Sequence, residues 1–169
     1  MRIAGLAAAL VVVATALGPT SPASASATSF CGELGGTWNG QYCHTTVQSD
    51  RNAVRDIKVA IPTELIDHPA VGPVLRDYLA TLVGNWRTVG TRMVADSFGE
   101  GNYQVFRHGD ALSLVYRETY HADGPDFNNA YRTFTFDMAR GTRLQLADLM
   151  KPGVDPLTAI PPLAHPYIV

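Results

Sequence analysis

Residues 73–90 read PVLRDYLATLVGNWRTVG, and this stretch decides the class of fold. Gly72-Pro73 is a helix-start signal, and Gly90 is a natural C-terminal cap. Apolar side chains recur between them at the three- and four-residue spacing of one helix face; they are Val74, Leu75, Tyr78, Leu79, Leu82, Val83, Trp86 and Val89. The stretch therefore predicts an amphipathic helix that packs on a core. Gly84, inside it, costs about 1 kcal/mol relative to alanine, and we expect it to let a strand approach closely.

Strand patterns lie on both sides of this helix. Before it, residues 54–61 place apolar side chains on one face, and Pro62 ends the strand. After it we expect a loop at 97–102, followed by strands at 103–106 and 111–121 that are joined by a tight turn at 108–110. A third strand at 131–137, a last strand signal at 144–146 and a helical turn at 147–150 complete the pattern. A strand, a helix and then consecutive strands predict an α+β domain, with an antiparallel β-sheet packed against one main α-helix.

The composition excludes two broad classes of protein. The chain has 169 residues, of which 46% are hydrophobic, and a formal net charge of −2. This apolar fraction and low charge are typical of a globular domain and not of a disordered chain. Since 13 Lys and Arg face 15 Asp and Glu without a basic run, we expect no nucleic-acid partner.

The first 27 residues are typical of a secretory signal peptide. One early charge, Arg2, precedes an apolar run over residues 3–17, which is shorter than the ~20 residues of a membrane-spanning helix. Small residues allow cleavage after Ala25 or Ala27, and we favour Ala27. We expect a secreted domain over 28–150, extracellular or in the cell wall and free of the membrane after cleavage. Residues 151–169 form a proline-rich tail.

Export changes how the two cysteines are interpreted. In an oxidising compartment Cys31 and Cys43 are expected to form a disulfide, which would stabilise the fold by roughly 3 kcal/mol in the chain-entropy model. The enclosed residues 32–42 include four glycines and predict a loop. A zinc site that uses His44 would be one ligand short of tetrahedral. We expect no metal and no cofactor.

Residue chemistry alone assigns no catalytic residue. Ser97 lacks the Gly-x-Ser-x-Gly context of a hydrolase nucleophile, and no histidine can be placed beside it from the sequence. The two His-x-Asp pairs, at 108–110 and 121–123, are explained by turn chemistry. Side chains able to stack on a sugar or anchor a protein partner are the candidate binding residues; they are Trp38, Tyr42, Tyr120, Asp123 and Tyr131.

Three stretches carry a resemblance to a known family. They are the predicted signal peptide followed by 31–43 (CGELGGTWNGQYC), then 56–62 (DIKVAIP), and finally Tyr120 through 131–137 (YRTFTFD) and 144–150 (LQLADLM) to 155–157 (DPL). In this order they resemble the mycobacterial secreted immunogenic antigens of the MPT/MPB type. The pattern is also similar to extracellular domains of the RsiV anti-sigma factor, which binds lysozyme, and to a domain attached to the PdaC peptidoglycan deacetylase.

The resemblance implies a non-catalytic binding protein or antigen at the cell envelope, whose partner is an unknown protein or an envelope glycan. Because one relative is described as a carboxylesterase, a weak short-chain carboxylesterase is the alternative. The chain departs from the family in two places. The turn at 123–127 (DGPDF) replaces Gly-Gly-x-His-Pro, and family members continue past Val169. We therefore expect a C-terminally truncated chain, with the tail either covering a sheet edge or beginning a missing half.

Overall fold

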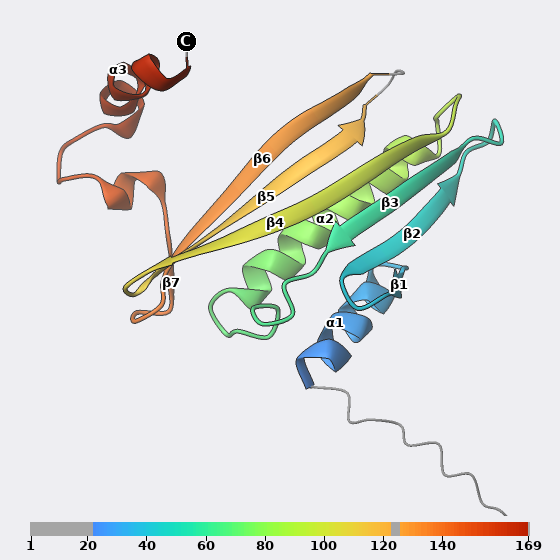
Figure 1. Cartoon of the computed structure of the whole chain (residues 1–169), viewed down its shortest axis with the longest axis horizontal. Coiled ribbons are helices and arrows are strands. Elements are labelled where there is room, and N and C mark those ends of the chain that lie inside the picture. Colours follow the sequence, from blue (N-terminus) through green and yellow to red (C-terminus); the bar gives the residue numbers. More distant parts are fainter. Residues whose placement is uncertain (1–21, 123–125, 169) are drawn as a thin grey trace, which may run out of the picture.

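A computed structural model describes residues 22–122 and 126–168 (Figure 1). The elements in chain order are α1 (Pro22–Glu33), β1 (Thr37–Trp38), β2 (Tyr42–Gln48), β3 (Val54–Ala60), α2 (Gly72–Gly90), β4 (Ser97–His108), β5 (Ala111–His121), β6 (Phe127–Asp137), β7 (Thr142–Leu144), the 3-10 helix η1 (Leu146–Leu149) and α3 (Pro156–Ile168). The predicted α+β class is confirmed.

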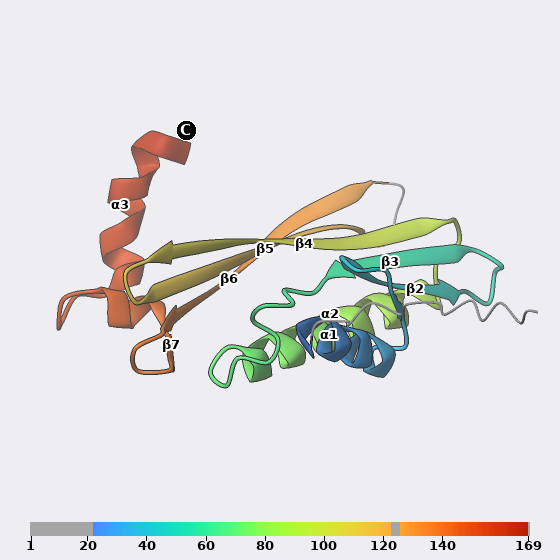
Figure 2. The ribbon, with the colours of Figure 1, turned by 60° about the horizontal axis from the view of Figure 1, so that its bottom comes forward.

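The seven strands form one sheet in their sequence order, β1 to β7. Neighbouring strands are antiparallel except β3 and β4, which run parallel in the register Arg55↔Ser97 to Val59↔Gly101. This exception follows from α2, since a parallel pair needs a crossover connection and α2 supplies it. Figure 2 shows α1 and α2 together on one face of the sheet. The opposite face is not covered by any described element, and this open face is what positions the candidate site.

The core lies between α2 and the sheet. The predicted stripe is confirmed, because Leu75, Leu79, Leu82, Val83 and Trp86 are all buried. They pack on side chains that alternate along the central strands, as the period of a half-buried strand requires; these include Ile57, Val59, Leu112, Leu114, Tyr116 and Phe136. The helix and the strands around it therefore fold together about one apolar layer.

The glycine that lets a strand approach α2 is Gly99 of β4, and the expectation for Gly84 is wrong. A Cβ added at Gly84 would meet nothing within 4 Å, because this residue lies on the exposed side of α2. A Cβ at Gly99 would instead lie 2.6 Å from Cε3 of Trp86. The Trp86 indole thus packs directly on the β4 backbone.

Three strand predictions need correction. Residues 97–102, expected as a loop, form the first half of β4 and pair with β3 on one side and β5 on the other; tertiary pairing here overrides the low strand propensity of glycine. β6 begins at Phe127, four residues before the predicted start. Strand β2 was not predicted at all, although its Thr and Val residues favour strands.

The N-terminal disulfide segment is more ordered than a loop. Within residues 32–42 the structure places the last turn of α1, the short strand β1 and the turn into β2. Helix α1 begins at Pro22, inside the predicted signal peptide, and Ala27 is fully buried in the core. The apolar run at 3–17 lies outside the described residues, and cleavage after Ala27 stays a prediction.

Arg55 is an unusual core residue, since its side chain is fully buried. Its Nη2 donates to the carbonyl of His121 at 2.9 Å, whereas Nε and Nη1 have no partner within the described part of the chain. Burial lowers the pKa of Arg55. Its methylene groups lie beside Gly90 at the C-terminal end of α2, where the helix dipole favours a cation.

The tail forms α3, a helix that contains Pro161, Pro162 and Pro166. It stands apart from the sheet in both ribbon views (Figures 1 and 2), so it does not cover the free edge of β6. Its Leu157 and Leu163 side chains are exposed. None of the described helices is long and apolar enough to span a membrane.

Candidate functional site on the open face of the sheet

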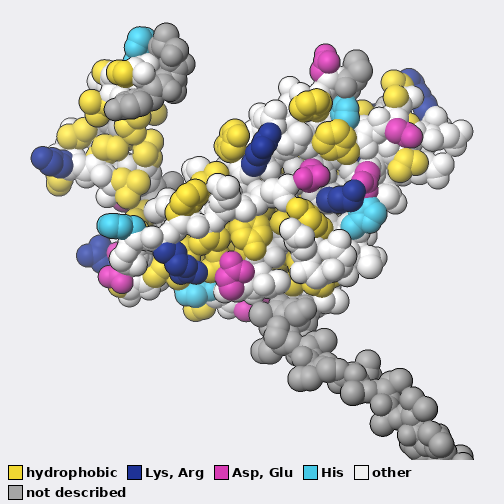
Figure 3. Space-filling model, in the orientation of Figure 1, with side chains coloured by type: hydrophobic (Ala, Val, Ile, Leu, Met, Phe, Trp, Pro, Cys, Tyr) yellow, Lys and Arg dark blue, Asp and Glu magenta, His cyan; other side chains and the backbone are white. Residues whose placement is uncertain are grey.

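The open face carries polar and aromatic side chains from five strands. Cross-strand register partners share a face, and the rows His44↔Lys58↔Glu100 and Asn102↔Arg117↔Tyr131 both lie on this one. Figure 3 shows basic, acidic and histidine side chains in a band across this face, among hydrophobic ones. The open face is therefore a mixed polar surface rather than an apolar one.

Asn102 is the centre of a fixed hydrogen-bond network. The hydroxyl of Tyr42 donates to Asn102 Oδ1 at 2.7 Å, and Asn102 Nδ2 donates to Glu100 Oε1 at 2.6 Å. Because the amide oxygen and the amide nitrogen each have a partner, the orientation of the Asn102 amide is determined. Strands β2 and β4, which are separated by β3, are thereby linked at their side chains.

A second polar cluster lies on β2 and β3. Asp56 accepts from Nε2 of His44 and forms an ion pair with Nζ of Lys58 at 2.8 Å. Partial burial by itself raises the pKa of Asp56, but the hydrogen bonds from Lys58 and His44 outweigh it and hold the pKa below its ordinary value. The hydrogen bond and the charge of Asp56 raise the pKa of Lys58. Asp56 is thus a carboxylate whose charge is already balanced by its neighbours.

Three adjoining hollows cross the open face. The largest, of about 600 Å³, lies over β4, β5 and β6 and is lined by Phe98, Glu100, Asn102, Arg117 and Tyr131, among others. A second, of about 290 Å³, shares Phe98 and Glu100 with it. A third, of about 310 Å³, shares Asn102 and reaches Gly40, Gln41 and Thr63. The hollows adjoin at these shared residues, and we call the three together the depression.

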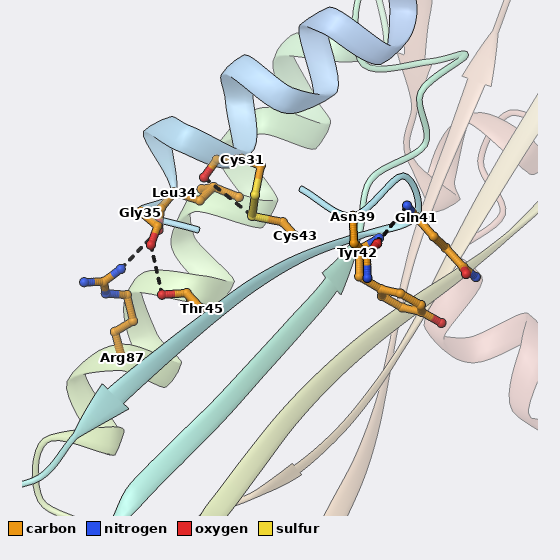
Figure 4. Close-up of a disulfide and its surroundings, with 9 residues drawn as sticks. All are labelled: Cys31, Leu34, Gly35, Asn39, Gln41, Tyr42, Cys43, Thr45 and Arg87. Atoms are coloured by element: carbon orange, nitrogen blue, oxygen red, sulfur yellow. Dashed lines mark hydrogen bonds between the residues drawn. A yellow bond between two sulfur atoms is a disulfide. The ribbon is translucent and has the colours of Figure 1, made fainter. Parts of the chain in front are cut away.

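The disulfide holds the turn at one end of this depression (Figure 4). Cys31 and Cys43 form the predicted bond, with their sulfur atoms 2.05 Å apart, and both residues are buried. In the turn between β1 and β2, Oδ1 of Asn39 accepts from the backbone N–H groups of Gln41 and Tyr42. Covalent and hydrogen-bonded constraints together fix where the Tyr42 side chain enters the open face.

The structure separates the predicted binding residues into two groups. Tyr42 and Tyr131 lie on the open face: Tyr42 is hydrogen-bonded to Asn102, and Tyr131 lines the largest hollow. Trp38 and Tyr120 lie on the helix face: Trp38 packs against the core, and the Tyr120 ring lies 5.9 Å from Trp86. Asp123 lies outside the described residues.

Sequence reasoning missed Glu100, Asn102 and Arg117, which line the largest hollow with Tyr131. In β4 and β5 these polar residues alternate with buried ones, and such alternation indicates a half-buried strand. The glycines of residues 97–102 favour a loop instead, so the sequence does not reveal this pattern in β4.

Ser97 has no catalytic surroundings. Its side chain is buried on the helix face, and Oγ finds no hydrogen-bond partner among the described residues. The nearest histidine along the sheet, His121, lies on the open face, where its Nδ1 accepts from the backbone N–H of Phe98. A hydrolase nucleophile needs a base within hydrogen-bond reach, and opposite faces of a sheet prevent it here.

The remaining histidine and acidic residues form no metal site in the described ranges. No group of three or more His, Cys, Asp or Glu side chains among them could hold an ion. The pair at 108–110 forms the β4–β5 turn, in which Gly109 has a positive φ of 54°. That turn bears out the turn interpretation of this His-x-Asp pair.

Comparisons with known proteins found likeness at two levels. A model of the family described as MVL, mannan-binding protein, matches residues 20–57, which run from α1 into β3 and include the disulfide. A solved structure of a DUF3298 family protein from Pseudomonas aeruginosa PAO1 is 16% identical with a TM-score of 0.51, covering 75% of this chain and 63% of that one. A DUF3298 family member from Bacteroides fragilis is 8% identical with a TM-score of 0.44, covering 66% and 60%. No curated protein matches.

The likeness to the Pseudomonas aeruginosa structure concerns the fold alone. The chain shares the architecture of the Pseudomonas aeruginosa protein and spans 63% of that protein's length. The mannan-binding match is confined to the N-terminal part of the chain. The strands in the matched part nonetheless supply Tyr42, His44 and Asp56 of the open face.

Proposed function

We propose that this protein is a non-catalytic glycan-binding protein of the cell envelope or its surroundings, and that it binds mannose-rich polysaccharide on the open face. One observation carries the proposal. The segment that matches a mannan-binding family contains Tyr42, the first residue of β2, whose hydroxyl donates a hydrogen bond to Asn102 at the edge of a polar hollow.

The chemistry of this face suits a sugar. Sugar hydroxyl groups both donate and accept hydrogen bonds, so they are best met by amides and carboxylates, which offer fixed acceptors and, for amides, donors. Asn102 and Glu100 offer these groups in a fixed orientation, and the exposed Gln41 lies beside them at the turn. Tyr131 and Phe98 offer aromatic surface for the apolar face of a sugar ring.

Two further features support an envelope location. A disulfide persists in oxidising compartments, and Cys31–Cys43 is formed and buried. The predicted signal peptide and the resemblance to secreted antigens, and to extracellular domains of the RsiV and PdaC type, are consistent with export. The proposal therefore includes a relationship to the mycobacterial secreted antigens and to the extracellular domains of the RsiV and PdaC type.

The test is binding of purified protein to mannan, measured by calorimetry and by retention on a mannan column. Asn102→Ala removes the central amide and is expected to weaken binding at least about tenfold, since it deletes ligand contacts and frees Tyr42 and Glu100. Asn128→Ala is the matched control, because Asn128 is exposed on the other face of β6. Equal thermal stability of the two variants is required for the comparison.

Absence of mannan binding by the natural chain would refute the proposal, as would equal affinity of the Asn102→Ala and Asn128→Ala proteins. A lysozyme pull-down run beside it tests a protein partner. Capture of lysozyme without mannan binding would replace the glycan by a protein ligand.

A further inference from the structure

The largest hollow contains a cation without a counter-charge. Arg117 of β5 makes no ion pair with any residue that the structure describes; its Nη2 donates to the neutral Oδ1 of Asn129 at 3.3 Å. Thr119 donates to the same Asn129 oxygen at 3.0 Å. Asn129 therefore positions the guanidinium but does not neutralise it.

The charged groups around Arg117 are engaged elsewhere. Glu100 accepts from Asn102 and lies near Lys58, whose pKa it helps to raise. Asp56 is paired with Lys58 and His44. On the neighbouring strand β6, the open-face register partner of Arg117 is the neutral Tyr131. Asp56 lies on β3, and Glu100, on β4, lines the hollow with its carboxylate hydrogen-bonded to Asn102; neither forms an ion pair with Arg117, which is left, within the described ranges, as the unpaired cation on the β5 side of the hollow.

Aromatic side chains flank this positive group. Tyr131 is 62% exposed and lines the hollow beside Arg117. Phe98 lines the same hollow and contacts the His121 ring edge-on, with ring centres 4.6 Å apart. An aromatic surface next to a guanidinium is suited to a sugar ring that carries an acidic substituent.

Given the glycan-binding function proposed above, we propose that the ligand is an extended anionic glycan, and that a carboxylate or phosphate group on it binds Arg117 in the large hollow while a neighbouring sugar binds at Asn102. The large hollow and the one at the β1–β2 turn share Asn102, so one chain of linked sugars reaches both. Planar bidentate pairing with an anionic oxygen group is the interaction that arginine forms best.

The experiment compares uncharged mannan, phosphomannan and polymannuronate on the same purified chain. We expect at least one charged polymer to bind about tenfold more tightly than uncharged mannan, with an advantage that shrinks as salt is added. A preference for phosphomannan identifies phosphate as the group bound, and a preference for polymannuronate identifies carboxylate. Arg117→Gln should remove the preference, measured within the variant as the ratio of its affinity for the charged polymer to its affinity for uncharged mannan.

Arg92→Gln is the matched control, because Arg92 is an exposed arginine in the turn after α2. Equal binding of all three polymers would overturn the anionic ligand, and a preference that survives in Arg117→Gln would overturn the role of Arg117; both results leave glycan binding intact. If none of the three polymers binds, the proposed function itself has failed. A preference lost equally in Arg92→Gln would show non-specific charge attraction and would also overturn the role of Arg117.

Discussion

The contact between Trp86 and the β4 backbone makes a quantitative prediction about two glycines. An ideal Cβ at Gly99 would lie 2.6 Å from Cε3 and 2.7 Å from Cδ2 of Trp86. Trp86 is only 4% exposed, so its neighbours enclose the indole. The ring cannot withdraw without disturbing the core around it. Gly99→Ala should therefore lower the free energy of unfolding by roughly 1–3 kcal/mol, which is typical of an overpacked core.

Gly84→Ala is the matched control, since it makes the same chemical change in α2. Nothing lies within 4 Å of the added methyl group, so only helix propensity changes. The substitution should stabilise the protein by about 0.8–1 kcal/mol. The two variants are thus expected to shift stability in opposite directions.

The assay is urea unfolding followed by circular dichroism and Trp fluorescence, with thermal melts beside it. For a domain of this size 1 kcal/mol corresponds to a shift of roughly 2–4 °C in Tm. A neutral Gly99→Ala would show that Trp86 does not pack on the β4 backbone. A destabilising Gly84→Ala would show that this side of α2 is covered, and either result would refute the packing described here.

Three further predictions concern the N-terminal half. Replacing Cys31 and Cys43 by serine should lower the free energy of unfolding by roughly 3 kcal/mol from loop closure, measured by urea unfolding against the oxidised protein; an unchanged midpoint would contradict it. Because the folded pKa of Asp56 is lowered, its contribution is present above the pKa of the unfolded chain and is lost as the pH falls through the folded value. The loss of unfolding free energy at acidic pH should therefore be smaller in Asp56→Asn than in the natural protein, and identical pH profiles would count against the pairing of Asp56 with Lys58 and His44. A chain that begins at Ser26 keeps the buried Ala27, so it should melt at a higher temperature than one that begins directly after Ala27; equal melting temperatures would show that Ala27 does not stabilise the core.

The main helix and the long strands could be predicted because their signals are local. The 3.6-residue apolar period marks α2 to within one residue, and alternation marks β5 at its observed bounds. The first half of β4 could not be predicted in this way. Gly99 and Gly101 there weaken the local strand signal, and the strand exists because β3, β5 and Trp86 surround it.

The candidate site was predictable only in part. Two aromatic side chains, Tyr42 and Tyr131, were found from composition and position. Asn102 and Arg117 were not, since a polar residue in a strand gains a role only from what the sheet register places beside it. The distance along the chain from Tyr42 to Asn102 contains β3 and α2, and no local pattern spans that interval.

The amino-acid sequence by itself determined the α+β class, the helix that covers the core and the pairing of the two cysteines, because periodicity and a single cysteine pair leave few alternatives. Tertiary structure alone decided which face of the sheet stays open and which polar side chains meet on it. The physical reason is that side chains of a strand alternate between two faces. Only the position of α1 and α2, and the register of β2 through β6, determines which face stays open and which side chains it carries.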